Sequence, residues 1–266
     1  MKTSRIKNIV IVILALVNAF LLVLLLGRQN QQRVAYERSV EQLSLLLANN
    51  GITFDTALLP DEVSYPTAEL SHDAGAEVSF ARALLGDAAA ERSTGGSSVY
   101  ESELGSLRFR ANGEVDGNLN RSLEDPADFF SRTLSDLGYR VDAPSALSNT
   151  GSGTAVAVRE VDGVVIFNAP LAFTFENNVL TSVSGSFLPS ITLTTPAGGT
   201  DAISALVRFL DYRNSNGLVC TQITSLDCGY LLQSSATSAK LVPAWHIATD
   251  TSEYYVNSVT GEITRE

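Results

Sequence analysis

The most constraining feature of the chain is an uncharged apolar run near its N-terminus. Residues 8–26, NIVIVILALVNAFLLVLLL, contain no Asp, Glu, Lys or Arg. An α-helix of this length would extend about 28 Å, close to the hydrocarbon thickness of a bilayer, about 30 Å. The run therefore predicts one transmembrane helix at 8–26, preceded by a short tail at 1–7.

A cleaved signal peptide is the alternative interpretation of this run. Export signals have an apolar region of about 7–15 residues, followed by small residues at the cleavage site. Here the longer run continues into LLLGRQNQQR, which contains no Ala-x-Ala-like site. We therefore expect an uncleaved anchor.

Basic residues flank the run unequally. Lys2, Arg5 and Lys7 precede it, whereas Arg28 and Arg33 follow it. Because segments rich in Lys and Arg tend to stay in the cytoplasm, this bias predicts a cytoplasmic N-terminus. The expected location is the cell membrane, crossed once, with the bulk of the chain extracytoplasmic.

The part of the chain beyond residue 26 is acidic. It contains 15 Lys and Arg against 29 Asp and Glu, a net charge of −14, whereas the whole chain has −11. A domain of this charge repels polyanions, so nucleic acid is not an expected partner.

Two cysteines and two histidines limit the expected metal and redox chemistry. Cys220 and Cys228 are close enough in sequence for a local disulfide on the oxidising side of a membrane, but two free thiols are the alternative. Neither their spacing nor that of His72 and His246 fits a zinc site. We expect no metal and no cofactor.

The segment after the apolar run predicts a stalk helix over 27–54. The sequence VAYERSVEQLSLLLANNG ends in Asn-Asn-Gly, which is a helix stop. Helical spacing places four apolar side chains on one face: Val40, Leu43, Leu46 and Leu47. The stalk would connect the anchor to the exterior domains.

Beyond the stalk, blocks of strands alternate with single helices. The patterns predict helices over 76–86, 125–138 and 201–217, and hairpin turns at Asn112-Gly113, Asp162-Gly163 and Asn177-Asn178. This order is typical of an α+β fold with antiparallel sheets. Because a helix-plus-sheet unit occurs twice, we expect two small α+β domains, 55–150 and 151–266, although no sequence repeat supports the division.

The C-terminal stretch LVPAWHIATDTSEYYVNSVTGEI, residues 241–263, predicts a hairpin with large groups on both faces. Alternation places His246 on one side of the first strand and Trp245 on the other. Trp245 is expected to pair across the hairpin with Tyr254 or Tyr255. His246 lacks a catalytic signature such as G-x-S-x-G or H-E-x-x-H, so we interpret the hairpin as structural.

Two segments of this region resemble a known family. ITSLDCGYLLQSS and LVPAWHIATDTSEYYVNSVTGEI are similar to the C-terminal signature of the YycI/YycH proteins, which has a Gly-Tyr strand, a Pro-x-Trp strand and a Tyr-Tyr-x-Asn…Thr-Gly-Glu hairpin. The N-terminal SRIKNIVIVILALVNAFLL is similar too. Residues 55–150 match in element order only, and the chain length favours the shorter YycI member.

The resemblance implies a regulatory protein without enzymatic activity. Proteins of this family are membrane-anchored and extracytoplasmic, and they modulate WalK, the sensor histidine kinase of a two-component system that controls cell-wall metabolism in Gram-positive bacteria. A YycH-like protein is the implied companion. The implied exterior domains are small α+β modules related to PepSY-like units.

Four residues of the predicted span form a candidate contact face for the kinase. Ala15, Asn18, Ala19 and Leu22 follow helical spacing, and two alanines four positions apart allow close backbone approach. An amide near the middle of the bilayer tends to find a partner on another helix. Chance occurrence of these residues is the alternative.

Two other functions fit the same sequence. One is a PepSY-like inhibitor or chaperone of an exported peptidase, which would bind without using the span. The other is an anchored envelope hydrolase that uses His246 or His72 with nearby carboxylates, which predicts a concave pocket with perturbed titratable groups.

Overall fold

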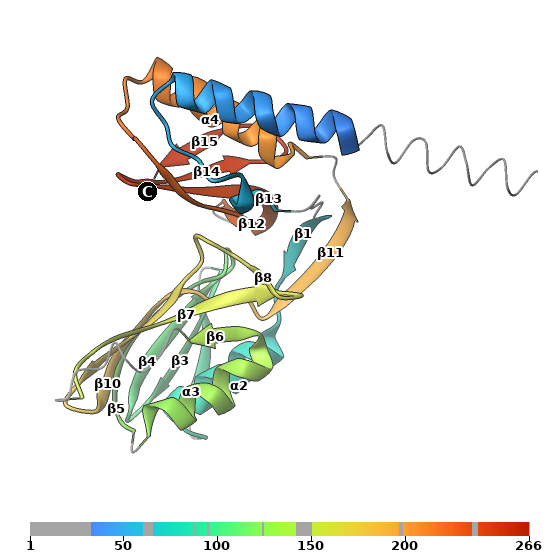
Figure 1. Cartoon of the computed structure of the whole chain (residues 1–266). Coiled ribbons are helices and arrows are strands. Elements are labelled where there is room, and N and C mark those ends of the chain that lie inside the picture. The colour runs from blue at the N-terminus through green and yellow to red at the C-terminus, as the bar shows by residue number, and fades with distance from the viewer. Residues whose placement is uncertain are drawn as a thin grey trace, which may run out of the picture.

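The computed structural model describes residues 33–60, 66–87, 89–94, 96–123, 125–141, 151–196, 199–235 and 239–265 (Figure 1). The predicted anchor and its contact residues Ala15, Asn18, Ala19 and Leu22 lie outside these residues. Among the helices of the described residues, none combines the length and the apolar character needed to cross a bilayer.

The fold is α+β, and its strands form two antiparallel sheets. In the described residues the larger sheet has nine strands in the order β2-β3-β4-β5-β10-β9-β7-β6, with β8 beside β7. The strands are β2 (Ala90–Thr94), β3 (Ser97–Ser102), β4 (Gly105–Arg110), β5 (Glu114–Ser122), β6 (Tyr139–Val141), β7 (Gly153–Val161), β8 (Val164–Val165), β9 (Leu171–Glu176) and β10 (Val179–Ser186). This sheet and its helices, residues 74–186, are here called the large lobe.

Two helices pack on the larger sheet, and both end at a glycine, as their predicted ranges indicated. α2 (Ala74–Leu85) begins at Asp73, whose side chain accepts a hydrogen bond from Ala76 N, and ends at Gly86 with φ +81°. α3 (Pro126–Leu134) continues into the 3₁₀ turn η2 (Ser135–Leu137) and ends at Gly138. The helices predicted over 76–86 and 125–138 are confirmed.

The core of the large lobe contains an aromatic cluster between its sheet and helices, which Phe187, just after β10, completes. Phe80 of α2 stacks on Phe187 with ring centroids 4.6 Å apart, and Phe130 of α3 lies 5.0 Å from Phe173. All four rings are buried. Aromatic burial of this kind contributes most of the packing energy of such a core.

The smaller sheet has six strands in the described residues. Its order is β11-β1-β13-β14-β15, with β12 on the other side of β13. The strands are β1 (Pro66–Ser71), β11 (Ser190–Pro196), β12 (Ile223–Ser234), β13 (Ala239–Thr249), β14 (Glu253–Asn257) and β15 (Ile263–Arg265). Together with α4 (Ala202–Ser215), the short η1 (Thr56–Leu58) and a helix over 33–49, this sheet forms the small lobe.

Helix 33–49 is part of the small lobe at its C-terminal end. Leu43 and Leu47 are 2% and 0% exposed and share a core with α4 and the sheet, whereas Leu46 is 39% exposed. This helix and α4 cover the face of the small sheet that points away from the large lobe (Figure 1). Of the stalk predicted over 27–54, residues 33–49 form this helix and its last turns fix it to the lobe, whereas 27–32 lie outside the described residues.

The two sheets divide the chain differently from the expected domains. β5 and β10, from either side of the expected boundary at 150/151, are paired in one sheet, with Gly117 opposite Val183. Likewise β1 pairs with β13, with Ala68 opposite Leu241. Element order alone could not reveal this pairing, because strands far apart in sequence meet only after the chain has folded.

The chain crosses between the lobes near residues 71–74 and 186–190. Tyr139 binds the backbone of the second crossing, at 186–190. Its hydroxyl donates to Ser186 O at 2.9 Å and accepts from Leu188 N at 2.7 Å. Arg159 Nε donates to Leu188 O at 2.9 Å. Burial raises the pKa of Tyr139, so this phenol stays protonated and keeps donating.

Candidate functional site

The hairpin of β13 and β14 places its large side chains on two opposite faces. The register pairs Trp245 with Val256, His246 with Tyr255 and Ile247 with Tyr254. Trp245 therefore faces a valine and not, as expected, a tyrosine. The aromatic partner of Tyr255 across the strands is His246, with ring centroids 5.1 Å apart and planes at 25°.

The face toward the helices is core. Trp245 is 2% exposed, and its Nε1 donates to Thr200 O at 2.7 Å. Tyr254 is buried with its ring 4.9 Å from that of Phe209 on α4. On this face the hairpin is framework, because both side chains are enclosed and the Trp245 N–H is hydrogen-bonded.

The face toward the large lobe carries His246 and Tyr255, and a residue from the large lobe covers both. The ring of Phe167 lies 5.2 Å from His246 and 5.5 Å from Tyr255. Gly229 on β12 makes room for it, since a Cβ there would lie 2.6 Å from the Phe167 ring. The sequence gives no signal for this contact, which joins residues more than 60 positions apart.

Backbone pairing holds this segment in place along the edge of β12. Ile166 forms a parallel bridge with Tyr230, and Phe167 N donates to Tyr230 O at 2.9 Å. The Asn168 amide continues the pairing: its Nδ2 donates to Leu232 O at 3.0 Å, and its Oδ1 accepts from Leu232 N at 2.7 Å. The two lobes are thus joined by a short strand-like contact.

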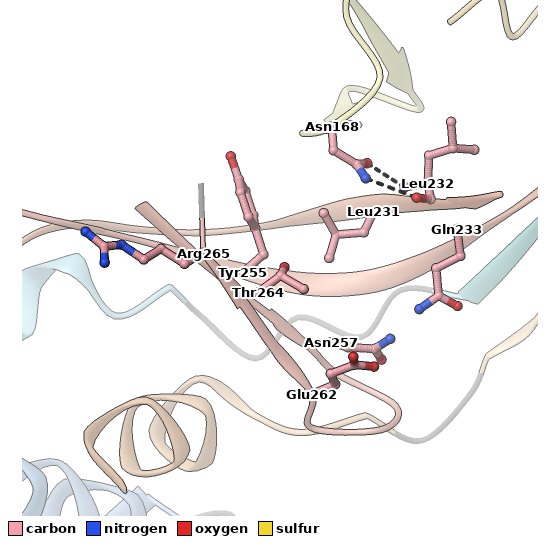
Figure 2. Close-up of a pocket in the computed structure, with 9 residues that line it drawn as sticks. All are labelled: Asn168, Leu231, Leu232, Gln233, Tyr255, Asn257, Glu262, Thr264 and Arg265. Atoms are coloured by element: carbon pink, nitrogen blue, oxygen red, sulfur yellow. Dashed lines mark hydrogen bonds between the residues drawn. The ribbon is translucent and has the colours of Figure 1, made fainter. Parts of the chain in front are cut away.

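A pocket of about 350 Å³ lies beside this contact, on the same face of the small sheet (Figure 2). Its lining residues are Asn168, Leu231, Leu232, Gln233, Tyr255, Asn257, Glu262, Thr264 and Arg265. Asn257 Oδ1 already accepts from Val259 N and Thr260 N. The pocket combines an apolar floor with a rim of amides and one charge of each sign, a lining that suits binding.

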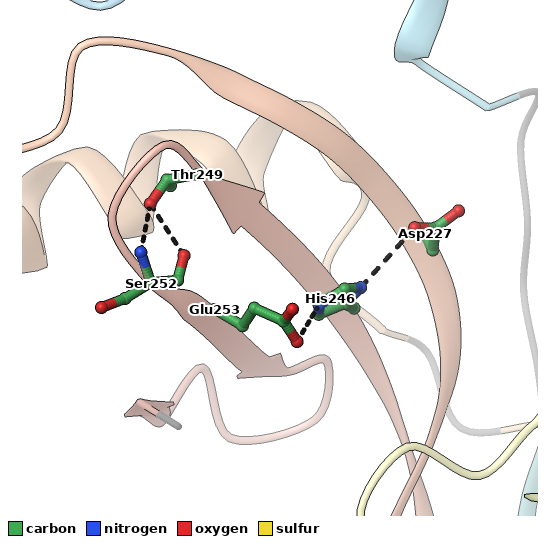
Figure 3. Close-up of polar contacts among 5 residues, drawn as sticks. All are labelled: Asp227, His246, Thr249, Ser252 and Glu253. Atoms are coloured by element: carbon green, nitrogen blue, oxygen red, sulfur yellow. Dashed lines mark hydrogen bonds and ion pairs between the residues drawn. The ribbon is translucent and has the colours of Figure 1, made fainter. Parts of the chain in front are cut away.

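His246 makes its polar contacts with two carboxylates (Figure 3). Its Nε2 lies 3.2 Å from Glu253 Oε2, and its Nδ1 lies 3.6 Å from Asp227 Oδ2. A catalytic histidine needs a nucleophile or a reacting proton within hydrogen-bond reach. In the described residues both ring nitrogens face acids, an arrangement that fits a structural or binding role.

The nearby hydroxyls belong to the hairpin turn. Thr249 Oγ1 donates to Ser252 O at 2.7 Å and accepts from Ser252 N at 3.1 Å (Figure 3). These bonds close the turn between β13 and β14. They occupy the Thr249 hydroxyl, which therefore serves the loop geometry and not His246.

Both cysteines are free thiols in the structure. Cys220 is buried, and burial raises its pKa. Burial also raises the pKa of Cys228 to about 12. A thiol reacts as its thiolate, so both groups are weak nucleophiles at neutral pH. Among the described residues, no three His, Cys, Asp or Glu side chains are placed to hold a metal ion.

The other histidine, His72, lies where the chain enters the large lobe. Its Nδ1 is 3.1 Å from Oε1 of Glu77, a residue of α2 that is 6% exposed. Burial raises the pKa of the Glu77 carboxyl above its ordinary value of 4.5. The charge of His72 and the Ser98 hydroxyl oppose this effect, whereas the charges of Glu91 and Asp73 add to it.

Glu77→Gln is expected to remove a pH-dependent loss of stability. Because the folded-state pKa is raised, the unfolded chain ionises first as the pH rises above 4.5, so ionisation of Glu77 favours unfolding. The free energy of unfolding of the wild type, relative to Glu77→Gln, should fall between pH 4.5 and neutrality. Urea unfolding across this range measures the difference, and a difference that is flat or rises with pH would contradict it.

The chain has no match among known families: no family model matches it, and no curated protein matches its sequence. The resemblance to the YycI/YycH proteins therefore rests on the segments quoted from the sequence.

Proposed function

We propose that the chain is a membrane-anchored, extracytoplasmic regulator that binds and modulates a sensor histidine kinase together with a YycH-like companion. The apolar run at 8–26, its basic flank and the similarity of the C-terminal segments to the YycI/YycH signature support this proposal. The kinase is of the WalK type, and the regulated process is cell-wall metabolism. The protein acts by binding and not by catalysis.

The position of helix 33–49 is the structural observation that best supports this proposal. Only residues 27–32 separate this helix from the apolar run, and Leu43 and Leu47 fix its end in the core of the small lobe. Because this separation is short, we expect a displacement of the span to act on a helix whose far end is packed in the lobe. A regulator that works through its membrane helix needs such a connection.

The contact face proposed for the kinase is the one that contains Asn18. Ala15, Ala19 and Leu22 complete this face on a helix. A hydrogen bond from such an amide to another helix contributes about 0.6–2 kcal/mol, so we expect the small residues to supply close packing in addition.

Asn18→Leu is expected to reduce capture of the kinase strongly. The protein would be purified from detergent-solubilised membranes, and co-purifying proteins identified by mass spectrometry. Loss of one interhelical hydrogen bond of about 1–1.5 kcal/mol corresponds to roughly tenfold weaker association. A chain that lacks residues 1–27 should capture no kinase.

The matched control moves the amide without changing composition. Leu16 lies on the opposite helical face, so the double variant Leu16→Asn/Asn18→Leu keeps one Asn in the span but displaces it. It should behave like Asn18→Leu. Equal capture by the wild type and this variant would refute the contact face, and capture without residues 1–27 would place recognition in the exterior lobes.

The exported-peptidase inhibitor makes a different prediction for the same experiment. A PepSY-like inhibitor would capture a soluble peptidase, and its capture would not depend on residues 1–27. Recovery of a peptidase in place of a kinase would therefore replace the regulatory proposal.

A further inference from the structure

A cavity of about 240 Å³ lies at the place where the chain passes between the lobes. Both crossings contribute to its wall, through residues 70–73 and 187–190, whose strand ends are neighbours because Ser71 pairs with Ser190. The β4–β5 turn at 110–113 and Ala239 of β13 close it further, and Glu77 of α2 lines it. Anything bound in this cavity touches both lobes.

Glu77 is an unusual group to find in this wall. Its side chain is 8% exposed, and its Oε2 is buried with no hydrogen bond of normal geometry in the described structure, although the Ser98 hydroxyl is near enough to lower the pKa of the carboxyl. Its other oxygen, Oε1, faces His72, whose side chain is 58% exposed. A buried carboxylate oxygen without a donor costs stability, so a ligand that supplies an N–H group here would recover it.

The charges around the cavity select the sign of the ligand. Arg110 lines the cavity, but its Nη1 is already engaged by Asp116 Oδ1 at 2.6 Å and by Glu114 Oε2 at 3.6 Å. Asp73 and Glu77 then leave a negative excess, which Glu91 reinforces from outside the wall. The complementary group is a cation that carries N–H donors.

The rest of the wall fits a short apolar stem. Leu70, Phe187, Leu188 and Pro189 are apolar, and they lie on the two crossings. A primary ammonium or a guanidinium on a short alkyl chain matches both parts of the cavity. A free amine and the side chain of a lysine or arginine on a partner share this chemistry.

We propose that this cavity binds an organic cation, an ammonium or guanidinium group on a short alkyl stem, whose N–H donors pair with Glu77. At Glu77 Oε1 the ligand replaces the exposed His72 side chain as the donor. Because both crossings line the cavity, an occupied site holds the two lobes in one relative orientation. That this ligand is an input to the regulator rests on the proposed function, whereas the binding itself does not.

The test is calorimetric titration of the full chain in detergent with n-butylammonium chloride, without any kinase present. We expect saturable binding that Glu77→Gln weakens at least about tenfold, the loss typical of a charge-assisted hydrogen bond. Glu91→Gln removes the same charge nearby, outside the cavity wall, and should weaken binding about twofold or less. n-Butanol, which keeps the stem but lacks the cation, should not compete.

Two further arms make the result decisive. The tripeptide Gly-Lys-Gly binding more tightly than n-butylammonium would assign the site to a side chain of a partner, and the reverse order would assign it to a free amine. His72→Ala should bind n-butylammonium at least as well as the wild type. Absence of saturation, or equal affinity in the wild type and a folded Glu77→Gln, would overturn the proposal and leave the kinase experiment unaffected.

Discussion

Trp245→Ala is expected to lower the free energy of unfolding by about 3–5 kcal/mol. The side chain is 2% exposed, and it fills the core between the C-terminal hairpin and the helices of the small lobe. Its loss leaves a large cavity and removes the hydrogen bond from Nε1 to Thr200 O. Equilibrium urea unfolding followed by circular dichroism measures the change.

Trp245→Phe separates the two contributions. The phenyl ring keeps much of the packing but lacks the donor, so Thr200 O loses its partner at a cost of about 1–2 kcal/mol, to which a smaller packing loss adds. A loss below about 1 kcal/mol for Trp245→Ala would contradict the framework role of this residue.

Leu47→Ala is expected to cost about 2–5 kcal/mol, the second large effect. This side chain is fully buried, and together with Leu43 it attaches helix 33–49 to the small lobe. Leu46→Ala is the matched control. It removes the same atoms from the preceding residue of the same helix, whose side chain is 39% exposed. The control should cost less than about 1 kcal/mol.

The comparison tests whether the helix that follows the apolar run is part of the lobe. Similar losses in the two variants would mean that helix 33–49 is not packed as described. In that case a displacement of the span would not reach the small lobe, and regulation through the membrane helix would lose its physical basis.

Local signals predicted most of the elements of this fold. The helix over 201–217 is found as α4, because Asp201 caps its start through Ser204 N. The turns at Asp162-Gly163 and Asn177-Asn178 are present, with positive φ at all four residues. Each of these signals depends on a few neighbouring residues, which is why sequence alone can detect them.

Strand pairing could not be predicted in the same way. The expected boundary at 150/151 assumed that neighbouring elements form their own sheets, but β10 pairs with β5 across it. Likewise, alternation correctly gave Trp245 and His246 opposite faces, but only the register of the hairpin decides that Val256 faces Trp245. Register depends on contacts along both whole strands, and single residues do not reveal it.

The surroundings of the candidate site residues were equally unpredictable from the sequence. His72 and Glu77 are five positions apart, but the cavity that they line is also lined by residues 110–113 and 187–190, which are distant in sequence. Phe167 meets His246 and Tyr255 through the strand-like contact between the lobes. Sequence reasoning identified the histidines as groups of interest, whereas their surroundings come from the tertiary fold.

Recognition through one face of the membrane helix can be examined in intact membranes by site-specific photo-crosslinking. A photoreactive residue would replace Leu22, on the face of Asn18, or Phe20, on the opposite face. Adducts with a sensor histidine kinase from position 22, and few or none from position 20, are the predicted result. Equal adducts from both positions, or no kinase adduct from either, would contradict a regulator that acts through this helix.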